Sequence, residues 1–178
     1  MIYASKVTHY QLRQLEEAYP LAHAIAQSIP NGMIYLTGIY ELMLNALEHG
    51  NLGIGFVEKS ALLRDGQWEI EIKHRLMLNQ HKSVFVTLTQ NRNTYELTIR
   101  DEGNGFNWRD YMVRTNKHEE IHGRGLSIAV GSKFDRLFYN DAGNQVTCII
   151  EHRPWESTPA ECQLMSWNKP LSAKEWAI

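Results

Sequence analysis

Apolar residues recur every three or four positions along the first third of the chain, which is the spacing of an amphipathic helix. This spacing predicts one helix from Tyr10 to Ile29. The sequence Pro30-Asn31-Gly32 then interrupts the pattern, and Asn31 is of the residue type that caps a following helix. Because the second apolar pattern stops at Gly50-Asn51, the chain is predicted to open with two helices joined by a tight turn.

The rest of the chain mixes short helical patterns with strand patterns. Two short helices are predicted between residues 56 and 79 and another from 126 to 133. Alternating, β-branched runs predict strands over 84–89, 94–100, 134–139 and 145–151. This order predicts an α+β fold, in which helices lie on one face of a mixed, mainly antiparallel sheet.

Three polar residues interrupt the second predicted helix at regular intervals. Glu41, Asn45 and His49 are four positions apart, so at about 100° per residue they form one polar stripe. The opposite side of the same helix carries the apolar residues Tyr35, Leu36, Ile39, Leu42, Met43, Ala46 and Leu47. One face of this helix is therefore expected to pack in the core, and the other to carry chemistry.

Length and composition restrict the functional classes. The 178 residues suit one domain, and 43% hydrophobic content is enough for a sizeable core. Lys and Arg number 18 against 20 Asp and Glu and form no basic stripe, which argues against a nucleic-acid partner. The chain shows neither a signal-peptide core nor an apolar run of about 20 residues, so no membrane insertion is expected. With two cysteines, Cys148 and Cys162, we expect a reducing, cytoplasmic setting.

The polar stripe suits magnesium and phosphoryl chemistry. Magnesium prefers hard oxygen ligands and keeps several waters, so the Asn45 amide oxygen together with triphosphate oxygens is a sufficient set. A carboxylate at Glu41, one turn earlier, can orient or deprotonate an attacking hydroxyl or water.

Two glycine-containing segments supply the other parts of a nucleotide site. In Asp101-Glu-Gly103-Asn-Gly105 the carboxylate of Asp101 can accept from the exocyclic amine of adenine, while the glycines let the backbone approach the ring. The segment Gly123-Arg124-Gly125-Leu126 opens a predicted helix, whose free N–H groups favour phosphate, and Arg124 adds positive charge.

These three segments together resemble the motifs of the GHKL ATPases, and the chain is most similar to the anti-sigma-factor serine kinases within that group. The resemblance covers roughly residues 5 to 152 and implies a Bergerat-type two-layer α/β sandwich that binds ATP and Mg²⁺. It implies that Glu41 activates the acceptor, Asn45 holds magnesium and Asp101 recognises adenine, with residues 106–122 as a lid. It further implies nucleotide contacts by these residues: His49, Gly103, Gly105, Gly123, Arg124, Gly125, Leu126 and Thr147.

The resemblance also implies the domain plan and the partners. Residues 1–152 form the ATP-binding domain, residues 52–83 are an insertion in it, and 153–178 are a C-terminal extension that contains tryptophan and proline. The expected partner is a protein: an anti-sigma antagonist, a sigma factor, or a receiver or phosphatase module. A homodimer is a further expectation.

The residues leave several alternatives open. His49 can simply pack at the helix end, Arg124 can be a surface residue, and a β-branched residue such as Thr147 needs no ligand in a strand. The same constellation also suits a nucleotide-gated interaction module, a slow ATPase, or the catalytic part of a split histidine kinase. These alternatives differ in whether the γ-phosphoryl group is transferred and in what receives it.

Overall fold

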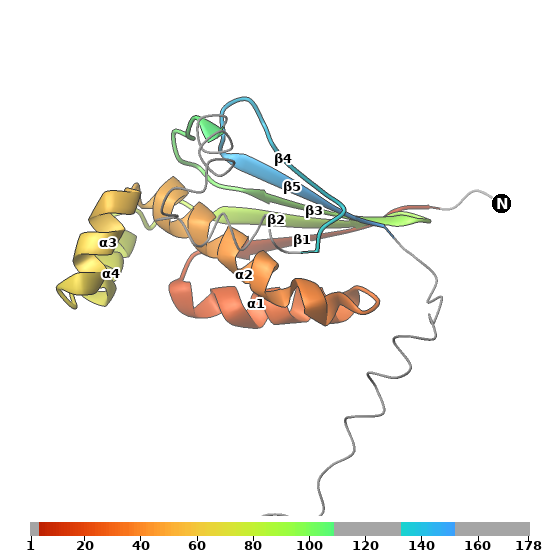
Figure 1. The fold of residues 1–178 in the computed structure, drawn as a ribbon, viewed down its shortest axis with the longest axis horizontal. Helices are drawn as coiled ribbons and strands as arrows, with labels where there is room; N and C mark the ends of the chain where they lie inside the picture. Colours follow the sequence, from red (N-terminus) through yellow and green to blue (C-terminus); the bar gives the residue numbers. More distant parts are fainter. Residues whose placement is uncertain (1–3, 109–132, 152–178) are drawn as a thin grey trace, which may run out of the picture.

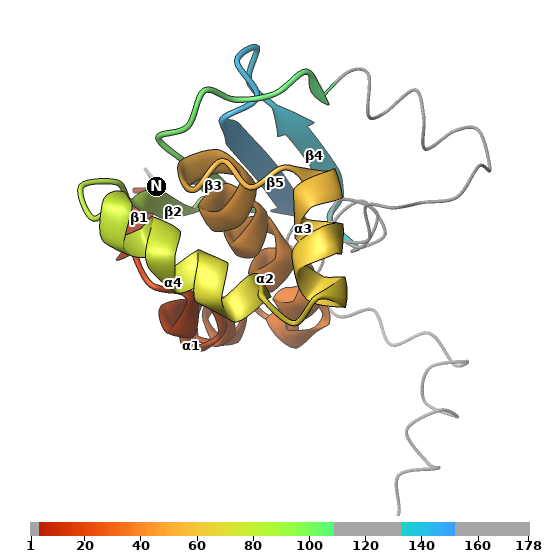
Figure 2. The ribbon, with the colours of Figure 1, turned by 90° about the vertical axis from the view of Figure 1, so that its left-hand side faces the viewer.

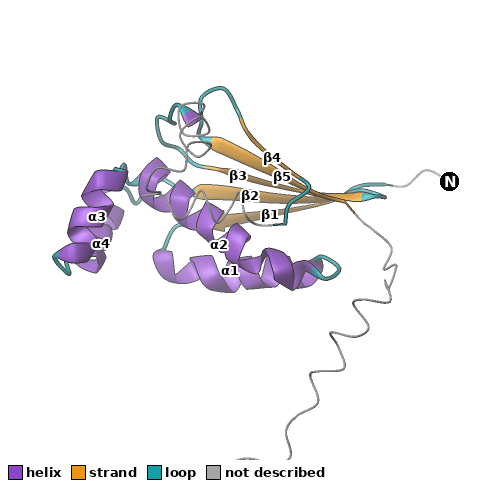
Figure 3. Ribbon diagram, in the orientation of Figure 1, coloured by secondary structure: helices purple, strands orange, loops and turns teal. Residues whose placement is uncertain are grey.

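The computed structural model describes residues 4–108 and 133–151, and in this part of the chain four α-helices accompany a five-stranded sheet (Figure 1). The α+β fold class is therefore confirmed. Helices α1 (Leu15–Ser28) and α2 (Leu36–Asn45) lie together against one face of the sheet (Figure 3). None of the helices in these residues combines the length and the apolarity that a membrane crossing requires.

The strands of the sheet lie in the order β1-β2-β3-β5-β4, and every pairing is antiparallel. Their bounds are Lys6–Leu12 (β1), Val84–Gln90 (β2), Thr94–Arg100 (β3), Arg136–Tyr139 (β4) and Gln145–Glu151 (β5). The last strand in the chain, β5, thus lies between β3 and β4. The described strands include no parallel pair, so the mixed character expected of the sheet is not found among them.

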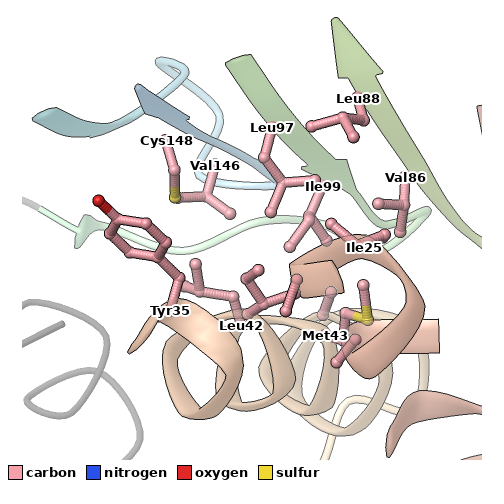
Figure 4. Packing of buried hydrophobic residues seen from close by; sticks show 14 of the residues in the cluster. Ile25, Tyr35, Leu42, Met43, Val86, Leu88, Leu97, Ile99, Val146 and Cys148 are labelled. Atoms are coloured by element: carbon pink, nitrogen blue, oxygen red, sulfur yellow. The ribbon is translucent and has the colours of Figure 1, made fainter. Parts of the chain in front are cut away.

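The alternation of buried and exposed residues along the strands shows which face of the sheet the helices cover. In β3, Tyr95, Leu97 and Ile99 are buried, while the residues between them are partly exposed. The register sets Leu97 opposite both Leu88 of β2 and Cys148 of β5, so buried positions coincide across the sheet. Figure 4 shows these side chains pointing toward those of α1 and α2. This layer of apolar contacts fixes α2 relative to the sheet.

The second predicted helix is divided into three pieces. A 3-10 helix, η1 (Gly32–Tyr35), precedes α2, and a π-helix, η2 (Ala46–Asn51), continues it. The end at Asn51 agrees with the sequence pattern. Asn31 is the N-cap residue of η1, as predicted, but its backbone is left-handed (φ 54°) and its side chain makes no capping hydrogen bond.

The first helix begins later in the structure than the sequence pattern predicts. Residues Lys6–Leu12 form strand β1, which pairs with β2, and α1 starts only at Leu15. At the start of α1, the Gln14 N–H donates to Glu17 Oε2 at 3.0 Å, which satisfies one of the free donors there. Pairing with β2 is a non-local interaction, so the local spacing of Tyr10 and Leu12 did not reveal it.

Residues 52–83, the predicted insertion, contain a helical hairpin beyond one end of the sheet (Figure 1), as the two short helical patterns predict. Helices α3 (Phe56–Arg64) and α4 (Trp68–Leu78) lie beside the end of α2 in both views (Figures 1 and 2). A second small cluster of buried residues, Leu52, Ile54 and Ile72, lies at their base, and Leu15 of α1 packs against it. Arg75 donates to the Leu52 carbonyl at 3.2 Å and pairs with Glu58 and Glu71, so α4 is tied to the end of η2 and to α3.

Candidate functional site

The end of the polar helix contacts the turn that follows β3. Gly50 in η2 lies directly against the carboxylate of Asp101, and a β-carbon on Gly50 would overlap that group. Gly103 lies against the Gly50 carbonyl just as closely. Two segments that are distant in sequence are thus in contact through glycine, because no other residue allows such an approach.

The side chains of Glu41 and Asn45 are half-buried and uncommitted. Neither makes a hydrogen bond or an ion pair with any residue in the described ranges. His49, by contrast, has a structural partner, because its Nδ1 lies within hydrogen-bond distance of the Ile54 carbonyl. Glu41 and Asn45 are therefore free to bind a ligand, whereas one imidazole nitrogen of His49 is already used.

Asp101 is a buried carboxylate, with only 8% of its surface exposed. Its Oδ1 accepts from the Gly103 N–H at 2.8 Å, and its own N–H donates to the Asn144 carbonyl at 3.0 Å. Burial raises the pKa of Asp101, while backbone N–H donors and the Lys82 ammonium act in the opposite direction. Its Oδ2 accepts no hydrogen bond from another described residue, so one acceptor remains available at the base of this turn.

A second glycine contact fixes the far side of the same turn. Gly105 (φ 73°) lies against the Ala142 carbonyl, and Gly143 (φ 77°) against the Phe106 carbonyl. Both glycines have a left-handed backbone conformation, and neither has room for a side chain. The Asp101–Phe106 turn is thereby held on the loop between β4 and β5.

Polar residues that sequence reasoning did not select complete this junction. Asn51 Oδ1 accepts from the Glu102 N–H at 2.8 Å, and Glu102 Oε2 accepts from the Ser83 N–H at 2.7 Å. Lys82 Nζ donates to the Asn51 carbonyl at 2.9 Å. The position of Asn51 at the end of the helix, beside Gly50, was the one sequence feature that could have pointed to its part in this junction. The roles of Lys82 and Glu102 depend on tertiary contacts that no local pattern contains.

Glu48 is the other residue that was missed. Its side chain is fully buried, next to His49 and within one turn of Asn45, and it forms an ion pair with Lys59 of α3. Its position three residues after Asn45 was a visible signal, but nothing in the sequence indicated a partner for it.

Thr147 lies apart from this cluster. Its neighbours Val146 and Cys148 are in the core beneath the helices, so by alternation Thr147 faces the other side of the sheet. Its hydroxyl lies 3.3 Å from that of Thr98 on β3. The contact described for Thr147 is thus a cross-strand one, and Asn144, not Thr147, meets Asp101.

Part of the predicted site lies outside the described residues. This applies to Gly123, Arg124, Gly125 and Leu126, to residues 109–122 of the predicted lid, and to the extension 153–178. The described residues therefore supply the helix stripe and the Asp101 turn.

The donor set that is present fits magnesium and a nucleotide. Asn45 offers an unshared amide oxygen, a ligand type that Mg²⁺ accepts, and Asp101 offers a free carboxylate oxygen for an amine. Compared with known proteins, the chain matches no family model and has no significant match among curated proteins. The functional interpretation therefore depends on the residues themselves.

Proposed function

We propose that this chain is a GHKL-like ATP-binding protein with a Bergerat-type two-layer sandwich fold. In this proposal the protein acts in the cytoplasm as a protein serine/threonine kinase. It transfers the γ-phosphoryl group of Mg-ATP to a hydroxyl of a protein partner, as an anti-sigma-factor kinase does. The observation that carries the proposal is the contact of Gly50 with Asp101 and Gly103, which joins two of the three motifs at one point.

Each uncommitted polar group has one role in this proposal. Asp101 Oδ2 accepts from the adenine amine, and the Asn45 amide oxygen holds magnesium beside the phosphates. Magnesium, when bound, offsets the negative charge of the phosphate oxygens. Glu41 takes the proton of the acceptor hydroxyl as its oxygen bonds to the γ-phosphorus, and the bond from that phosphorus to the bridging oxygen breaks to release ADP.

Nucleotide binding is tested by calorimetric titration of the wild-type protein and Asn45→Ala with Mg-ATP. We expect wild-type binding and at least a tenfold weaker affinity for Asn45→Ala, because a magnesium ligand is lost. Asn93→Ala is the matched control, since Asn93 is exposed in the β2–β3 turn. Wild-type protein that binds no ATP would overturn the proposal.

Group transfer is tested with γ-labelled ATP and candidate acceptor proteins, with phosphate release followed in parallel. Glu41→Gln is expected to retain ATP binding and to lose at least a hundredfold in transfer rate, because the general base is removed. Glu96→Gln, on the uncovered face of β3, is the control. Phosphate release without a labelled protein would indicate an ATPase in place of a kinase.

A nucleotide-gated interaction module is the second candidate, and the insertion favours it. Val57 on α3 is 81% exposed, and Ile70 and Met77 on α4 are 62% and 67% exposed. Ile70 and Met77 are seven positions apart on α4 and so share one face of that helix. An exposed apolar helix face is the kind of surface at which another protein can bind. ATP binding without transfer to any acceptor, and without phosphate release, would support this candidate.

A further inference from the structure

Glu48 and Lys59 connect the candidate site to the insertion. Glu48 belongs to η2, the direct continuation of the helix that carries Glu41 and Asn45, whereas Lys59 belongs to α3. Their side chains form an ion pair in which the carboxylate is fully buried and the ammonium side chain is 23% exposed. Apart from this contact with Lys59, neither oxygen of Glu48 has a polar partner in the described residues. Lys59 is therefore the described group that compensates this charge.

A buried ion pair of this kind needs a reason other than stability. Removing two charges from water costs several kcal/mol per ion, so a buried pair is often no more stabilising than apolar side chains of the same volume. Apart from Lys59, no described residue makes a polar contact with the carboxylate. The ion pair is therefore better explained by its electrostatic effect on the neighbouring residues of α2 and η2.

The neighbouring residues are those of the polar stripe, Glu41 and Asn45, beside which the nucleotide phosphates are proposed to lie. Glu48 is within one turn of Asn45, and burial together with the charges of Glu41 and Glu48 raises the pKa of Tyr40. Both carboxylates thus act on the same part of α2. A triphosphate beside Asn45 would be repelled by a bare Glu48 charge, which water cannot screen because the group is buried.

We infer that Lys59 is a positioning residue of the nucleotide site, which cancels the charge of Glu48 and so allows phosphates to bind beside Asn45. This inference rests on the proposed function and deepens it, because it gives the 52–83 insertion a part in nucleotide binding. The insertion then supplies a cation to a site whose other described parts come from α2, η2 and the β3 turn.

The test is a four-protein comparison of the wild type, Lys59→Met, Glu48→Gln and the double variant. Affinities are measured for Mg-ATP by calorimetry and for AMP by competition, because AMP lacks the β- and γ-phosphates. Lys59→Met is expected to weaken Mg-ATP binding about tenfold and AMP binding less than twofold. Glu48→Gln is expected to bind Mg-ATP at least as tightly as the wild type, and the double variant to return to within threefold of it.

A pair that serves only to hold the fold predicts a different pattern. Both single variants would then lose thermal stability and would lose ATP and AMP affinity in equal proportion, which would overturn the inference. Lys59→Arg keeps the charge and is expected to bind Mg-ATP within threefold of the wild type. Lys73→Met, on an exposed position of α4, is the control for loss of a lysine from the insertion.

Two further outcomes separate this inference from the proposed function. Absence of ATP binding by the wild-type protein overturns the proposed function and this inference with it, whereas ATP binding that Lys59→Met leaves unchanged overturns this inference alone. If Lys59→Met does not fold, the double variant is compared with the wild type, because removing both charges is expected to leave Mg-ATP binding within threefold. Mg-ATP binding by the double variant that is more than threefold weaker than that of the wild type would then overturn the inference.

Discussion

Gly50 and Asp101 are in direct contact, because the Asp101 carboxylate occupies the space in which a β-carbon on Gly50 would lie. This contact sets the distance between the end of η2 and the turn after β3. The position of Asp101 relative to Asn45 therefore depends on the absence of a side chain at residue 50. Several consequences of the packing in this region can be measured.

Gly50→Ala is expected to lower both stability and ATP affinity, because the new β-carbon overlaps the Asp101 carboxylate. Overpacking of this kind costs about 1–3 kcal/mol of unfolding free energy, measured by thermal or denaturant unfolding. Gly55→Ala is the control, since no atom lies near its would-be β-carbon and its φ of −68° suits alanine. Equal stability of Gly50→Ala and the wild type would contradict the contact.

Gly105→Ala and Gly143→Ala are expected to destabilise the protein more than Gly66→Ala. All three glycines have a left-handed backbone, but only Gly66 has open space around it. Gly66→Ala thus measures the backbone strain alone, about 1 kcal/mol, while the other two add overlap with a carbonyl. Urea unfolding of the three variants gives the difference, and equal losses would show that the two loops do not pack closely.

Asp101 makes folding stability depend on pH. Burial raises its pKa above the ordinary 3.8, so the folded state binds its proton more tightly than the unfolded chain does. The unfolding free energy contributed by this group is therefore highest below pH 3.8 and falls as the pH rises through the raised pKa.

Asp101→Asn cannot ionise, and it is expected to lack this loss of stability. Melting temperatures of the two proteins, measured from pH 3 to 7, test the prediction. We expect Asp101→Asn to gain stability relative to the wild type as the pH rises. A difference that does not change with pH would contradict a raised pKa at this residue.

Two isoleucines of α4 give a matched pair. Ile72 is 1% exposed in the second small cluster of buried residues, whereas Ile70 is an exposed residue of the same helix. Ile72→Ala is expected to cost about 2–4 kcal/mol of unfolding free energy and Ile70→Ala less than about 0.5 kcal/mol. Denaturant unfolding measures both, and similar losses would show that Ile72 does not pack in this cluster.

Much of the fold was predictable because its patterns are local. The β2–β3 hairpin has alternating β-branched residues on both sides of a polar turn, and the structure pairs the two strands as that pattern predicts. The apolar side of the second helix was likewise predictable, since Ile39, Leu42 and Met43 are all buried. In both segments neighbouring residues contain the whole signal.

The features that were missed depend on residues far apart in sequence. β1 exists because residues 6–12 pair with residues 84–90. Tyr10 and Leu12 are more buried than the residues beside them, as in a strand, but the sequence-based prediction assigned them to the helical pattern that follows. The burial of Glu48 and its ion pair with Lys59 of α3 depend on tertiary contacts that the local sequence does not contain. Residue type and spacing were the grounds for selecting Glu41, Asn45 and Asp101, and the roles of these residues remain predictions. The contact between their segments is a tertiary contact that the sequence alone did not show.

The position of β5 between β3 and β4 also has a consequence for synthesis on the ribosome. The strand that fills the gap is the last of the five to emerge, so β4 has no partner until residues 145–151 have left the exit tunnel. Until then the backbone edge of β3 stays open, beside the apolar side chains of Leu97 and Ile99. A nascent chain stalled before residue 145 should therefore be the species that a chaperone binds.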